Sequence, residues 1–74
     1  MLEEMKEELV TIGILYDGEL TKETSLREDL GLDSLDAMEL VTRLESRYEI
    51  SISDDSAELS ETIGDLIRIV EKLK

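Results

Sequence analysis

Ser34 is the side chain in this sequence whose type and position best suit chemistry. It lies between Asp33 and Leu35 at the start of a predicted helix. The sequence has no histidine and no cysteine, so it cannot build a Ser-His pair or supply a thiol nucleophile. A serine at a helix N-terminus can still hold a phosphodiester, because free N–H groups and the helix dipole favour negative charge there. Ser34 is therefore either a helix cap or a site that another enzyme modifies.

The helix that begins beside Ser34 is predicted to have two apolar faces. At about 100° per residue, one arc forms a core face made of Ala37, Leu40, Val41, Leu44 and Tyr48. A second, separate patch contains Leu35 and Met38 and is bordered by the acidic residues Asp33, Asp36, Glu39 and Glu45. Two interpretations remain open: the patch covers the preceding loop, or it is a docking surface for transient partners.

The elements that would position these residues are all helical, because the apolar residues recur at spacings of three and four. The spacing predicts helices from Leu2 to Ile12, from Ser34 to about Tyr48, briefly after Ser53, and from Thr62 to the last residues. Three longer helices and a short third one indicate an all-α fold. We expect a small four-helix bundle, with a long loop between its first two helices and one domain spanning residues 1–74.

Local signals fix the predicted helix ends and the path of the long loop. Asp33 with Asp36, and Thr62 with Asp65, have the spacing of capping boxes. Gly13 is expected to end the first helix. In the loop we expect Leu20 and Leu26 to pack against the helices, and a short turn capped by Ser25 with Glu28 to end at Gly31.

The charge of the chain narrows its possible partners. The 74 residues include 20 acidic and 8 basic side chains, giving a net charge of −12. Such a surface repels nucleic acid and anionic membranes and attracts basic patches on proteins. The N-terminal residues do not form a signal peptide, and no apolar run is long enough to span a membrane. We therefore expect a cytoplasmic monomer that binds neither nucleic acid nor membrane and has no metal site.

One stretch resembles a known family. Leu30-Gly31-Leu32-Asp33-Ser34-Leu35-Asp36, followed by Met38-Glu39-Leu40-Val41 and Leu44-Glu45, is similar to the acyl carrier protein signature. The length, the acidity, the long first loop and the short third helix are also similar to that family. The resemblance implies that a phosphopantetheinyl transferase attaches 4′-phosphopantetheine from coenzyme A to Ser34. It further implies a carrier, not an enzyme, that presents acyl thioesters to enzymes of fatty-acid or related biosynthesis.

The resemblance also assigns roles around the arm. Asp33, Asp36, Glu39 and Glu45 would meet basic residues of partner enzymes, and Leu35 and Met38 would add apolar contact. An apolar acyl chain would need an interior that can open. We expect aliphatic residues on inward faces of the second to fourth helices to line it, namely Leu44, Ile52, Leu59, Ile63 and Ile67.

The sequence departs from the common pattern of the family in three places. Arg43 and Arg47 interrupt the acidic side of the second helix, and Arg43 is expected to pair with Glu39 one turn earlier. Ser53 stands where many carriers have proline. The segment 58–62 is one residue longer than expected. Two alternatives therefore remain open: a specialised carrier of aminoacyl or polyketide intermediates, and a helical adaptor without an arm.

Overall fold

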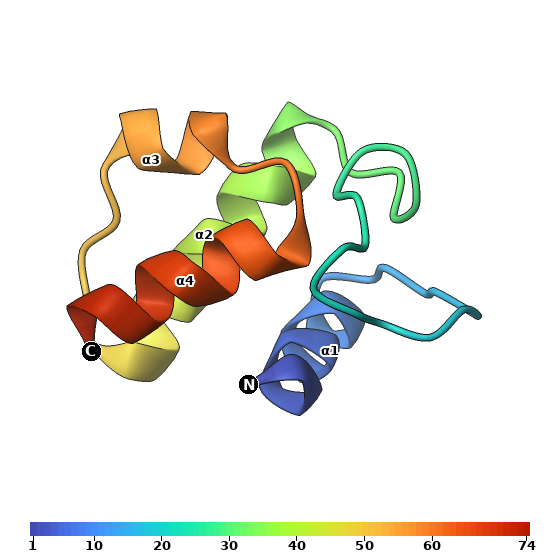
Figure 1. Cartoon of the computed structure of the whole chain (residues 1–74), viewed down its shortest axis with the longest axis horizontal. Helices are drawn as coiled ribbons and strands as arrows, with labels where there is room; N and C mark the ends of the chain where they lie inside the picture. The colour runs from blue at the N-terminus through green and yellow to red at the C-terminus, as the bar shows by residue number, and fades with distance from the viewer.

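The computed structural model describes residues 1–74 and contains four helices (Figure 1). These are α1 (Leu2–Thr11), α2 (Ser34–Tyr48), α3 (Asp54–Leu59) and α4 (Ile63–Leu73). The predicted all-α fold with a short third helix is confirmed. None of the helices combines the length and the apolar composition that crossing a bilayer requires.

The core joins apolar side chains from α1, α2, α4 and the loops that connect the helices. The sequence periodicity predicted the helical part of this set, since each helix contributes residues three or four positions apart. The buried apolar residues are Met5, Leu9, Leu26, Leu30, Leu32, Leu40, Val41, Leu44, Ile52, Ile63, Leu66, Ile67 and Val70.

Helix α2 begins and ends at residues whose conformations stop it from extending further. At its start, the Asp36 N–H donates to the Asp33 carboxylate at 2.8 Å, and the Asp33 N–H donates back to Asp36 at 3.5 Å. This is the capping box that the sequence predicted. At its end, Glu49 has a left-handed backbone with φ of 54°. Ser34 is therefore fixed as the first helical residue.

The long loop between α1 and α2 follows the path that the sequence predicted. Leu26 is buried, Leu20 packs against the core, and the Ser25 hydroxyl accepts from the Glu28 N–H at 3.1 Å. The turn ends at Gly31, which has a φ of +68°.

The loop is also tied to the segment that connects α3 to α4. The Leu26 N–H donates to Glu61 O at 2.9 Å, the Ile63 N–H to Thr24 O at 3.0 Å, and the Gly64 N–H to Lys22 O at 2.9 Å. A Cβ at position 64 would lie 2.8 Å from that same Lys22 oxygen, so the close approach requires glycine. These bonds join two segments that are far apart in the sequence.

Helix α3 lies at the top of the view in Figure 1, packs against α2, and contributes no buried residue. The Ser53 hydroxyl caps it by accepting from the Ser56 N–H at 3.1 Å. Ala57 packs against the core, but Leu59 is 79% exposed. The predicted inward position of Leu59 is therefore wrong. Two residues of helix carry a side chain about 200° around the axis, so Leu59 points away from the side on which Ala57 packs.

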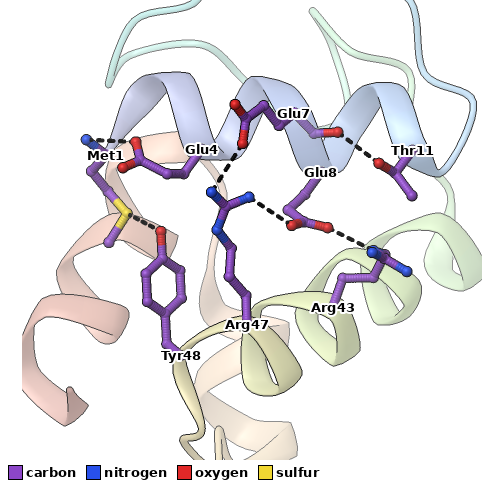
Figure 2. A network of polar contacts seen from close by, with 8 residues as sticks. All are labelled: Met1, Glu4, Glu7, Glu8, Thr11, Arg43, Arg47 and Tyr48. Carbon is purple, nitrogen blue, oxygen red and sulfur yellow. Dashed lines mark hydrogen bonds and ion pairs between the residues drawn. The ribbon is translucent and has the colours of Figure 1, made fainter.

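Helices α1 and α2 run antiparallel and are joined by a network of ion pairs (Figure 2). Glu8, which is buried on α1, accepts from Arg43 Nε at 2.6 Å and from Arg47 Nη1 at 2.9 Å. Arg43 therefore pairs with Glu8, and the expected pairing with Glu39 is wrong. A buried carboxylate on a neighbouring helix is a stronger partner than an exposed one along the same helix, because water screens it less.

Candidate functional site

Ser34 is exposed at the N-terminus of α2, and its hydroxyl is not needed to cap the helix. Asp33 is the cap, since its carboxylate accepts the N–H of Asp36. No hydrogen bond within the chain uses the Ser34 hydroxyl. The interpretation of Ser34 as a simple cap is therefore wrong, and its oxygen is open to reaction from solvent.

The surroundings of Ser34 suit a phosphodiester. The N–H groups of Ser34 and Leu35, in the first turn of α2, form no backbone hydrogen bond and remain available to phosphate oxygens. Asp33 and Asp36 bring negative charge close by, but both are engaged in the capping box. The residues present can therefore hold a phosphopantetheine group, which would supply the thiol that this chain lacks.

Leu35 and Met38 lie on the solvent side of α2, next to Ser34. Leu35 is 79% exposed and does not cover the preceding loop, while Met38 is 44% exposed and borders the groove between α2 and that loop. Asp33 and Glu39 are exposed around them, while Asp36 is half-buried. We name Leu35, Met38, Asp33, Asp36 and Glu39 the α2 face. Its exposed apolar centre with a charged rim has the character of a transient binding surface.

Glu45 differs from the other acidic residues that were expected to contact partners. It is half-buried in the C-terminal half of α2, and its carboxylate accepts the Ile52 N–H at 2.8 Å. This bond fastens the loop after α2 to the helix, where Ile52 enters the core. Glu45 therefore has a structural partner within the chain, and the α2 face is concentrated at the N-terminal half of the helix.

A groove with a volume of about 860 Å³ opens beside Ser34. It lies between the first half of α2 on one side and the loop 25–28 with segment 57–62 on the other. Its polar rim includes Ser34, Glu28, Glu58 and Glu61. Its apolar lining consists of Leu26, Leu32, Ala37, Met38, Leu40, Val41, Ala57 and Leu66.

The residues expected to line an acyl pocket do not border this groove. Leu44, Ile52, Ile63 and Ile67 are buried in the closed core, and Leu59 faces solvent. Sequence reasoning did not identify Leu26, Val41 and Leu66 as residues that line the groove. Periodicity indicates that a residue is buried, but it does not show which buried residues meet at an opening. Proximity in sequence to Ser34 could have pointed to Leu26 and Val41, but not to Leu66, which lies on α4.

Two ionisable groups near helix ends are shifted by their partners. The hydrogen bond from Arg43 holds the pKa of Glu8 below its usual value, and Arg47 adds to this effect. The hydrogen bond from the Glu61 N–H lowers the pKa of Asp65, and the hydrogen bond from the Thr62 N–H lowers it further. Both carboxylates thus support the fold in their ionised form. No group of acidic side chains is arranged to hold a metal ion.

Comparison with known proteins gives a consistent result. Residues 11–70 match the family model described as a phosphopantetheine attachment site. The chain is 38% identical to an acyl carrier protein of a Sulfurovum species over 73 residues, covering 99% of this chain and 97% of the relative. It is 49% identical to an acyl carrier protein of Exiguobacterium sibiricum over 53 residues, covering 72% and 67% of the two chains.

Solved structures with the same arrangement of helices are also similar in sequence. An acyl carrier protein of Mycobacterium tuberculosis superposes with a TM-score of 0.85 at 33% identity, covering 95% of this chain and 93% of that one. A hexanoyl acyl carrier protein of the actinorhodin polyketide synthase from Streptomyces coelicolor gives 0.82 at 33% identity, with coverages of 97% and 87%.

Proposed function

The chain belongs to the acyl carrier protein family, a family whose members bear phosphopantetheine, and we propose that Ser34 is its attachment site. The observation that carries this proposal is the exposed Ser34 hydroxyl, which has no bond within the chain and lies at the start of α2 beside a groove with an apolar lining. The Ser34 oxygen would attack the phosphorus that bears pantetheine in coenzyme A, forming a phosphodiester while the pyrophosphate bond breaks and adenosine 3′,5′-bisphosphate leaves. The base that removes its proton would come from the transferase, since the chain has no histidine.

Intact-mass measurement tests the proposal directly. Incubation with coenzyme A and a phosphopantetheinyl transferase is expected to convert the chain into one species, heavier by a single phosphopantetheine. Peptide mapping should place the added mass on the segment that contains Ser34. An unchanged mass, with a transferase that loads a reference carrier in the same tube, would contradict the proposal and favour the adaptor without an arm.

We propose that the α2 face binds the transferase and acyl-processing enzymes through their basic patches. Its acidic rim gives long-range attraction, and Leu35 and Met38 add short-range apolar contact. Reversing one rim charge should therefore slow association. We expect Glu39→Lys to lower the transferase kcat/KM about tenfold at low salt, and less as salt screens the exposed charges.

The control for this substitution must lie away from Ser34. Glu61 is unsuitable, because it borders the groove beside Ser34. Glu3 is exposed on α1 near the end where Met1 contacts Tyr48, at the opposite end of α2 from Ser34 (Figure 1). Glu3→Lys makes the same charge change and should lower kcat/KM much less. Equal losses would mean that net charge alone steers the partners, and the localised face would have to be withdrawn.

We propose that the groove beside Ser34 shelters the first carbons of a bound acyl chain. Each methylene removed from water there contributes about 0.8 kcal/mol, so burial of three or four should stabilise the fold by about 3 kcal/mol. Octanoylation of the arm is then expected to raise the melting temperature by more than 5 °C. The NMR signals of Val41 and Ala57 should shift more than those of Ile67. An acyl chain left in solvent would change neither quantity.

The nature of the cargo stays open between fatty acyl, aminoacyl and polyketide intermediates. The similarity to a carrier of a polyketide synthase from Streptomyces coelicolor supports keeping a polyketide intermediate among the candidate cargoes. The attachment chemistry is the same for all three cargoes, so the arm cannot distinguish them. Mass spectrometry of the protein from its native cell, with thioesters preserved, would identify the group that it carries.

A further inference from the structure

The α2 helix carries two arginines in a chain whose proposed partners are basic. Arg43 and Arg47 lie in its second half, beyond the acidic residues of the α2 face. A free positive charge there would repel a basic partner and oppose the attraction of the acidic residues. In the structure each arginine is paired with at least one carboxylate, and both carboxylates, Glu7 and Glu8, come from α1 (Figure 2).

The ion-pair network balances its charges. Glu8 joins both arginines, and Glu7 accepts from Arg47 Nη2 at 2.9 Å. Two carboxylates therefore face two guanidinium groups. The Glu8 side chain is only 7% exposed, so its pairs are shielded from salt more than surface pairs are. Arg43 holds the pKa of Glu8 below its usual value, which keeps this carboxylate charged at neutral pH.

The network also fixes where the guanidinium groups point. Figure 2 shows Arg43 and Arg47 directed from α2 toward α1. The Arg43 side chain remains 46% exposed, so without Glu8 it could turn toward solvent and toward Glu39, one turn earlier. Pairing with Glu39 would remove an acidic group from the α2 face and add a cation beside it.

We propose that Glu7 and Glu8 are positioning residues for partner docking, which turn Arg43 and Arg47 toward α1 and cancel their charge. Helix α1 thereby sets the electrostatic character of α2 without touching the partner. A basic enzyme then meets an α2 surface that is acidic at its docking end and neutral beyond it. This inference rests on the proposed function, since it assumes that the α2 face docks the transferase.

The test measures the kcat/KM of a transferase that loads the wild-type chain. Glu7→Gln leaves the network with one positive charge in excess, while Glu3→Gln removes an equal charge from the same helix at a residue with no basic partner. We expect Glu7→Gln to lower kcat/KM about threefold at low salt, and Glu3→Gln to leave it nearly unchanged. Glu7 is exposed, so this substitution should not prevent folding.

A second substitution separates the local effect from net charge. Adding Arg47→Gln to Glu7→Gln should restore the wild-type rate, because it removes the excess charge. Adding Arg68→Gln restores the same net charge from α4 and should not restore the rate, since Arg68 lies outside the network and is 79% exposed. Glu8→Gln, checked for folding by its thermal transition, should reduce kcat/KM more than Glu7→Gln.

Three results would overturn the inference. The first is an equal loss of kcat/KM for Glu7→Gln and Glu3→Gln. The second is a restoration of the rate by Arg68→Gln that matches the one by Arg47→Gln. The third is slower loading of the Arg43→Gln variant of the wild-type chain, which would mean that this arginine binds an acidic group of the partner. Failure of the proposed function is distinguishable from all three, because the wild-type chain would then gain no mass.

Discussion

Replacing Ser34 with alanine is expected to abolish the attachment of phosphopantetheine, with no residual modification at other residues. The Ser34 hydroxyl is exposed at the first position of α2 and makes no bond within the chain. Alanine removes the oxygen that would form the phosphodiester and changes little else. After incubation with coenzyme A and a transferase, the variant should keep its unmodified mass, while the wild type gains one arm.

The structure allows this result to be separated from misfolding. Asp33 caps α2, so Ser34→Ala should change the free energy of unfolding by less than about 0.5 kcal/mol. Ser46 is another exposed serine on the same helix and provides the matched control. Ser46→Ala should be loaded like the wild type. Attachment to the Ser34→Ala variant would disprove the assignment of the site.

Replacing Leu44 with alanine is expected to destabilise the fold by about 2–5 kcal/mol. Leu44 is 0% exposed and lies at the centre of the core face of α2. The substitution leaves a cavity between α2 and the surrounding helices. A domain of this size has a total stability near the low end of about 5–15 kcal/mol, so a loss at the upper end of the expected range would unfold a large fraction of the molecules. Urea unfolding monitored by circular dichroism would measure the loss.

Leu35→Ala is the matched control for this experiment, because it makes the same chemical change on the same helix. Leu35 is 79% exposed, so its loss should cost less than about 0.5 kcal/mol. The two substitutions should also differ in function: Leu35→Ala should weaken partner binding in a folded protein. Similar losses of stability for both variants would show that α2 does not use the predicted core face.

The helix boundaries could be predicted because the signals that set them are local. The box of Asp33 and Asp36, the box of Thr62 and Asp65, and the turn capped by Ser25 each involve residues three positions apart. The expected inward positions of Ile63 and Ile67 on α4 are likewise confirmed, since both are buried. The position of Ser34 at a helix start followed from these local signals alone.

Contacts between distant segments could not be predicted in the same way. Periodicity gave Arg43 a neighbour on its own helix, while the structure pairs it with Glu8 on α1. The tie between Leu26 and Glu61 brings Glu61 to the rim of the groove, a contact that no local pattern in the sequence indicates. Leu59 looked like a core residue because a helix of six residues is too short for its apolar pattern to define a face.

The hydrogen bonds that tie the long loop to the start of α4 have a consequence for how the groove fluctuates. Amide protons of Leu26, Ile63 and Gly64 lie in these bonds, so they should exchange with solvent slowly despite lying outside or at the edge of helices. The amides of α3 should exchange fast, because none of its residues is buried. The side of the groove that faces α2 is therefore expected to combine a stiff part, the tied loop, with a soft part, α3. A guest would widen the groove by displacing α3, at a free-energy cost far below that of global unfolding.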